Sequence, residues 1–103
     1  MQIKPISIRL LNCLYLGSFI LPVSATEISA EVIAFSCYGC HGSDGASEKP
    51  DLPRLKAKPA DELEKKLLNF KYDRTYSTIM GRIAKGYTDI ELKAVAQYLS
   101  QRK

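Results

Sequence analysis

The chain has 103 residues, of which 46% are hydrophobic and 25% charged, and its formal net charge is +4 at pH 7. Two of its 15 basic residues, and none of its 11 acidic ones, lie in the first 25 positions, so the remainder carries about +2. This length accommodates one small domain, and so balanced a charge excludes the clustered basic face of a nucleic-acid-binding protein.

The first 25 residues have the pattern of a secretory signal peptide. Lys4 and Arg9 are basic, Leu10 to Val23 is an apolar run, and Val23-Ser24-Ala25 supplies the small residues of a cleavage site. We therefore expect cleavage near Ala25, location in the periplasm, and a mature domain of residues 26–103 that is not stably inserted in a membrane. An uncleaved anchor is the alternative, although the run is shorter than the about 20 residues of a membrane-spanning helix.

A helix is predicted from about Glu27 to Cys40, with Ile28, Val32 and Phe35 at helical spacing as its core face. It leads into Cys37-Tyr38-Gly39-Cys40-His41, which reads C-x-x-C-H, the attachment signature of a c-type haem. Two thiols at this spacing lie on one face of a helical turn, where they can reach the two vinyl groups at one haem edge. The histidine that follows can then ligate the iron.

A pair of cysteines spaced like Cys37 and Cys40 also occurs in zinc sites and in redox dithiols. A zinc site needs a second pair of ligands, but no cysteine follows Cys40 and His41 is the only histidine. A redox dithiol of the thioredoxin type needs a βαβ setting, and no strand-rich stretch precedes the motif. Haem attachment is therefore favoured, and a single motif predicts a single haem.

The rest of the mature chain contains a loop and two further predicted helices. Residues 42–59 are rich in Gly, Ser, Asp and Pro and form a loop expected to wrap the haem edge near His41. A second helix begins near Pro59, and a third begins at Thr88, with Glu91 completing a capping box. The expected inward residues of these two helices are Leu63, Leu67, Leu68, Phe70, Ile90, Leu92, Val95, Ala96, Tyr98 and Leu99.

Met80 is the only methionine of the mature chain, in a non-periodic, glycine-containing stretch just before the third helix. Histidine and methionine together are the axial ligands that raise the potential of cytochromes c. We therefore expect Met80, presented on a loop, as the second iron ligand. A methionine that only fills a gap in the core is the alternative.

This arrangement resembles class I cytochrome c, which implies an all-α fold of three main helices around one covalently bound haem. Pro53-Arg54-Leu55 is similar to the P-x-L step of that family, in which the proline carbonyl accepts a hydrogen bond from the haem-ligating histidine. The resemblance therefore assigns this role to Pro53, with Pro50 as the competing candidate.

The segment Ser77-Thr78-Ile79-Met80-Gly81-Arg82-Ile83-Ala84-Lys85-Gly86-Tyr87 resembles the cytochrome subunit of flavocytochrome c sulfide dehydrogenase. That resemblance implies electron transfer from an FAD-containing partner subunit that oxidises sulfide, with no bond chemistry on this chain. The better-known members carry two haem modules, whereas this sequence shows the pattern of the first only.

Two other functions stay open at this point. The first is a free cytochrome that shuttles electrons. The second is a five-coordinate haem that binds a small ligand, and ligation of the iron by Met80 would oppose it. A permanent subunit should expose an apolar patch, whereas a shuttle should offer a small polar or basic one. Four cations could ring the distal edge of the haem and dock an acidic partner: Lys71, Arg74, Arg82 and Lys85.

Overall fold

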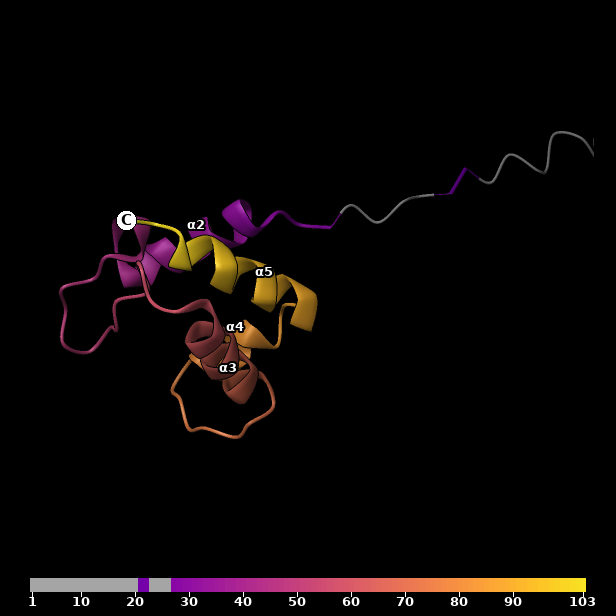
Figure 1. Ribbon diagram of the computed structural model, residues 1–103. Coiled ribbons are helices and arrows are strands. Elements are labelled where there is room, and N and C mark those ends of the chain that lie inside the picture. The colour runs from indigo at the N-terminus through magenta and orange to yellow at the C-terminus, as the bar shows by residue number, and fades with distance from the viewer. Residues whose placement is uncertain (1–20, 23–26) are drawn as a thin grey trace, which may run out of the picture.

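The computed structural model describes residues 21–22 and 27–103, and this part of the chain is helical, with no strand (Figure 1). In chain order its elements are α2 (Ala30–His41), the 3₁₀ turn η1 (Ser43–Gly45), α3 (Ala60–Lys71), the short α4 (Met80–Ala84) and α5 (Asp89–Ser100). The predicted all-α fold with three main helices is confirmed. Of the expected signal peptide only Leu21 and Pro22 are described, and no helix within the described ranges is long and apolar enough to cross a membrane.

The starts of the helices follow from local capping chemistry. The Ser29 hydroxyl accepts a hydrogen bond from the Val32 amide at 3.4 Å, so α2 begins three residues later than predicted. The predicted capping box of α5 is confirmed, because the Glu91 amide donates to the Thr88 hydroxyl at 3.2 Å and the Thr88 amide donates to the Glu91 carboxylate at 2.8 Å.

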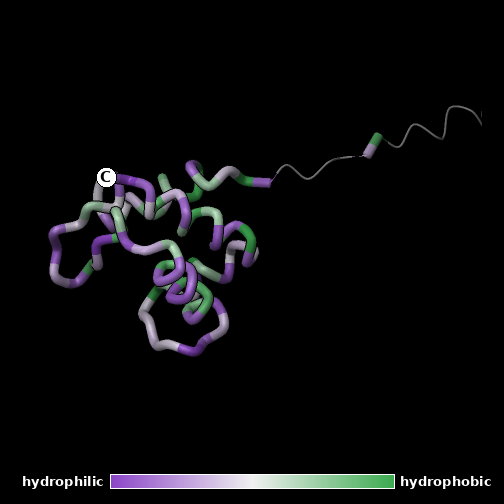
Figure 2. Tube along the Cα trace, in the orientation of Figure 1, coloured by the Kyte–Doolittle hydropathy of each residue, from purple (hydrophilic) through white to green (hydrophobic). Residues whose placement is uncertain are grey.

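The hydrophobic core lies where α5 packs against both α2 and α3. Helix α4 lies within the segment that joins α3 to α5 and packs against α3. In Figure 2 the hydrophobic residues gather on the helices, whereas the loop between η1 and α3 is mainly hydrophilic. The buried hydrophobic residues of the described chain are Ile33, Ala34, Leu63, Ala84, Leu92, Val95, Ala96 and Leu99.

The predicted core face of the first helix is wrong. Ile28, Val32 and Phe35 are exposed, whereas Ile33 and Ala34 are buried. The reason is that α5 packs on the side of α2 that carries Ile33 and Ala34. Each residue step turns the helix by about 100°, so Val32 and its neighbour Ile33 point in different directions.

The predictions for the other two helices hold in part. Leu63 of α3 is buried, and four of the predicted α5 residues form the buried side of that helix. Leu67 and Tyr98 are partly buried and pack against this core, whereas Leu68 and Phe70 are partly buried but lie outside it. Ile90, which we expected inside, is 70% exposed. It lies in the first turn of α5, two positions before Leu92 and therefore about 200° around the helix from that buried residue.

The loop at 42–59 is fastened to the rest of the fold at two points. The Gly45 carbonyl accepts hydrogen bonds from the amides of Leu55 and Lys56 at 2.8 and 3.0 Å. The Ala57 amide donates to the carbonyl of Leu99 at 3.2 Å, near the end of α5. These bonds hold the loop beside the C-terminal end of α2, where the cysteine motif lies.

Candidate haem-binding site

The two cysteines lie on the last turn of α2. The Cys37 side chain is half-buried, with its sulfur 3.4 Å from the Ile33 carbonyl, and Cys40 is exposed. Both are free cysteines. Burial is the largest influence on the Cys37 thiol and raises its pKa. A redox-active dithiol needs a thiolate of lowered pKa, so this environment opposes the dithiol interpretation.

His41 ends α2, and its side chain is the buried polar group of the described chain, at 6% exposure. Its Nδ1 lies 2.7 Å from the carbonyl oxygen of Pro53. A carbonyl can only accept, so Nδ1 carries the proton and donates it. In a neutral imidazole the other nitrogen, Nε2, then keeps a lone pair that can bind a metal. The sequence left Pro50 and Pro53 as alternatives, and the contact in the structure is to Pro53.

Met80 is the first residue of α4 and is half-buried. We expected it on a loop, but the chain turns into a helix at this residue. The turn is set by Ser77, whose hydroxyl accepts a hydrogen bond from the Gly81 amide at 2.8 Å. Its place on a helix packed against α3 gives the thioether a fixed support rather than a mobile one.

Comparison with known proteins decides the family. The family model for cytochrome c matches residues 27–103. The chain belongs to the cytochrome c family. It is 42% identical over 73 residues to the cytochrome subunit of sulfide dehydrogenase from Chlorobaculum tepidum, covering 71% of this chain and 66% of that relative. It is 39% identical over 70 residues to cytochrome c-553 from Nitratidesulfovibrio vulgaris, covering 64% of this chain and 69% of that one.

A second cytochrome c-553, from Desulfomicrobium norvegicum, is 31% identical over 77 residues, which cover 71% of this chain and 94% of that relative. This chain is therefore a class I cytochrome c that transfers electrons and resembles the sulfide dehydrogenase subunit. Family membership implies covalently bound haem c, and the single C-x-x-C-H motif implies one such group.

The residues at the end of α2 fit this cofactor. They offer two thiols on one helical turn and a histidine whose Nδ1 donates to the Pro53 carbonyl. Histidines that bind a metal through one ring nitrogen almost always donate a hydrogen bond from the other, which orients the ring. Within the described ranges, by contrast, no three His, Cys, Asp or Glu side chains are grouped so that they could hold a metal ion directly. This opposes the zinc interpretation.

The four distal cations of the cytochrome are not equivalent. The Lys71 amine is 2.6 Å from the Asp89 carboxylate, and Lys85 is 2.8 Å from that of Asp73. These two charges are neutralised within the chain. Arg74 and Arg82 have no ion-pair partner among the described residues, although Arg74 lies over the Tyr72 ring, 5.3 Å from its centre. The docking role of the four cations stays a prediction, and Arg74 and Arg82 are the two of them whose charge is not balanced by an ion pair among the described residues.

One contact near the motif could not be predicted from the sequence. The hydroxyls of Ser36 and Tyr87 lie 3.1 Å apart, although 51 residues separate them. Ser36 directly precedes Cys37, so this bond ties the motif-bearing turn to the residue before the α5 cap. No periodic pattern or short motif signals such a pair, because it exists only once α2 and α5 have packed together.

Proposed function

We propose that this cytochrome works in the periplasm as the haem subunit of a sulfide dehydrogenase and takes electrons from an FAD-containing flavoprotein subunit. The observation that carries the proposal is its 42% identity to a protein named as the cytochrome subunit of such an enzyme. The export pattern of residues 1–25 supports the location, since covalent haem attachment in bacteria takes place on the outer side of the inner membrane.

Within this proposal, Cys37 and Cys40 would hold haem c by two thioether bonds, and His41 and Met80 would ligate its iron. Bound haem c supplies a one-electron carrier. The bond from His41 to Pro53 would orient the proximal ring and raise its basicity. Met80 would close the sixth position, which favours electron transfer over the binding of small ligands.

An exposed apolar stripe on α2 supports a lasting partner. The Val32 and Phe35 side chains are 57% and 61% exposed, and Ile28, just before the helix, is 49% exposed. Phe35 lies two residues before Cys37 and so about 200° around the helix from it, on the side away from the thiols. Exposed aromatic and aliphatic groups of this kind are typical of the buried centre of a stable interface.

The test is to purify the native protein from the periplasm and to look for flavin absorbance that co-purifies with the haem and bleaches with sulfide. Phe35→Asp should release the flavoprotein while leaving the haem spectrum unchanged. Ile90→Asp is the matched control, since Ile90 is also apolar and 70% exposed but lies on α5. Haem without flavin in the native preparation would refute the subunit assignment.

The alternative is a free soluble cytochrome that shuttles electrons between larger redox complexes. Arg74 and Arg82, which have no ion-pair partner in residues 27–103, favour it, because a small basic surface suits brief encounters with an acidic partner. In that case Arg82→Gln should slow reduction by the partner and weaken its dependence on salt. The Phe35→Asp change should then have no effect.

A further inference from the structure

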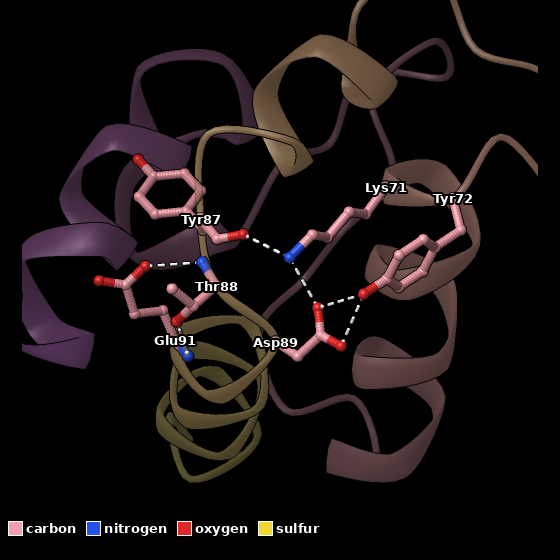
Figure 3. A network of polar contacts seen from close by, with 6 residues as sticks. All are labelled: Lys71, Tyr72, Tyr87, Thr88, Asp89 and Glu91. Carbon is pink, nitrogen blue, oxygen red and sulfur yellow. Dashed lines mark hydrogen bonds and ion pairs between the residues drawn. The ribbon is translucent and has the colours of Figure 1, made fainter.

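Residues 73–88, which we call the distal segment, join α3 to α5 and carry Met80. The residues that flank this segment meet in one polar cluster (Figure 3). Lys71 is the last residue of α3, and its amine donates to the Tyr87 carbonyl at 2.8 Å and to the Asp89 carboxylate at 2.6 Å. Tyr72 follows Lys71, and its hydroxyl lies 2.9 and 2.8 Å from the two carboxylate oxygens of Asp89, the first residue of α5. We call Lys71, Tyr72 and Asp89 the clamp.

The clamp differs from an isolated surface ion pair, because two donors converge on one carboxylate. The Lys71 side chain is 18% exposed, whereas the Asp89 side chain is 52% exposed. Charge-assisted hydrogen bonds of this kind are stronger than those between neutral groups. The carboxylate also lies in the first turn of α5, where the helix dipole favours negative charge. The Thr88–Glu91 capping box beside it fixes that turn (Figure 3).

The polar contacts inside the segment do not replace the clamp. Lys85 pairs with Asp73, but both residues lie within the segment, and both side chains are more exposed than that of Lys71. The Ser77 hydroxyl bonds only to the Gly81 amide, within the same segment. Both contacts link residues within the range 73–85 to each other. The clamp instead links the end of α3 to the start of α5, on either side of the segment.

Tyr87 extends this connection to the motif-bearing helix. Its carbonyl accepts from Lys71, and its hydroxyl meets that of Ser36, which directly precedes Cys37. Lys71 therefore lies at one end of a short chain of contacts that leads through Tyr87 to the turn of α2 that carries the thiols.

We propose that the clamp is a positioning device that keeps the distal segment closed and so controls how readily the Met80 thioether leaves the iron. This inference rests on the proposed ligation by Met80. Without the clamp, the ends of residues 73–88 lose this polar link and are held by the packing of α5 on α3. Local opening of the segment between them needs far less free energy than unfolding of the whole domain. External ligands would then reach the sixth position more often.

The experiment measures the rate at which imidazole binds to the oxidised, haem-loaded full chain. Lys71→Met keeps the apolar stem and removes the charge, Asp89→Asn keeps the shape, and Tyr72→Phe removes one hydroxyl. We expect binding to be about tenfold faster in the first two variants and less accelerated in the third. Lys66→Met is the matched control, since it breaks the exposed Lys66–Glu62 pair on the same helix, and its rate should not change.

Two comparisons separate positioning from general destabilisation. Ser29→Ala removes the cap of α2 and should lower the denaturation midpoint without faster imidazole binding. The Lys71→Met/Asp89→Asn double variant should bind imidazole no faster than either single variant, because both remove the same clamp. If a charge variant fails to mature, Tyr72→Phe still tests the clamp, because it removes only one hydroxyl from a half-exposed side chain.

The outcomes distinguish this inference from the proposed function. Unchanged imidazole binding in all clamp variants, with the thioether-to-iron absorption band present in the wild type, would overturn the clamp alone. A wild type that lacks this band would overturn ligation by Met80, and the clamp inference would fall with it.

Discussion

The Nδ1 atom of His41 and the carbonyl oxygen of Pro53 lie 2.7 Å apart, although twelve residues separate them in the chain. This bond joins the end of α2 to the middle of the following loop. It fixes one tautomer of the imidazole, and it leaves Nε2 as the nitrogen that can bind iron. One backbone carbonyl therefore controls both the orientation and the basicity of the proposed ligand.

Replacing Pro53 by glycine should loosen this contact. The loop gains conformational freedom in the unfolded state, which should lower the free energy of unfolding by up to about 1 kcal/mol. A longer bond makes the imidazole less basic, so the oxidised iron is less stabilised and the reduction potential should rise. Redox titration and chemical denaturation of the haem-loaded protein measure the two effects.

Pro50→Gly is the matched control for this change. Pro50 is exposed in the same loop, and its carbonyl is not the one that His41 contacts. Its replacement should change stability by a similar amount and leave the potential where it was. Equal shifts of potential in both variants would contradict a specific role for the Pro53 carbonyl.

The parts of the fold that depend on local chemistry could be predicted from the sequence. Thr88 and Glu91 stand three residues apart, and a capping box needs only these two side chains and the backbone between them. The C-x-x-C-H motif is equally local, because five consecutive residues place both thiols and the imidazole on one turn.

The parts that depend on packing could not be predicted in this way. Val32 and Ile33 are both apolar, and only the approach of α5 decides that Ile33 is the buried one. The sequence likewise names Lys71 and Lys85 as cations but does not show that Asp89 and Asp73 neutralise them. Those partners lie 18 and 12 residues away, and the pairs form once the helices are in place.

Gly45 should not tolerate a side chain. Its backbone has φ of +71°, in the left-handed region, and an added Cβ would lie 3.1 Å from the Cβ of Leu55. Strain and overpacking together should make Gly45→Ala less stable by about 2–4 kcal/mol in chemical denaturation. Gly39→Ala is the control: apart from its chain neighbours and the backbone of its own helix, no described atom lies within 4 Å of its added Cβ, and alanine is the better helix former. A Gly45→Ala variant as stable as Gly39→Ala would refute this account of the turn.

Asp44 should make stability depend on pH at the acid end. It pairs with Arg102 at 2.7 Å and with Lys56 at 3.2 Å, and Arg102 first, then Lys56, hold the pKa of its carboxyl below the usual range. The stabilisation is present above the unfolded-state pKa of about 3.9 and is lost as pH falls through the lower folded-state value. Urea midpoints of wild type and Asp44→Asn, measured from neutral to acid pH, should therefore differ at pH 6 and begin to converge only as the pH falls below about 4. A constant difference over that range would show that Asp44 does not contribute through its charge.

The chain should depend on haem attachment for its folding. Eight hydrophobic residues are buried in the described part, and three of them are alanines, which contribute little apolar surface. Small domains with so little core usually need a metal, a cofactor or disulfides to fold.

A Cys37→Ala/Cys40→Ala variant, which has no thiol left in residues 26–103 to form a thioether, should therefore lose most of its helical circular dichroism. Ser43→Ala, an exposed position two residues after the motif, is the control and should keep both haem and helix. If the double variant kept the helical signal and a cooperative thermal transition, α5 packing on α2 and α3 would suffice for the fold. Thioether attachment would then serve electron transfer alone.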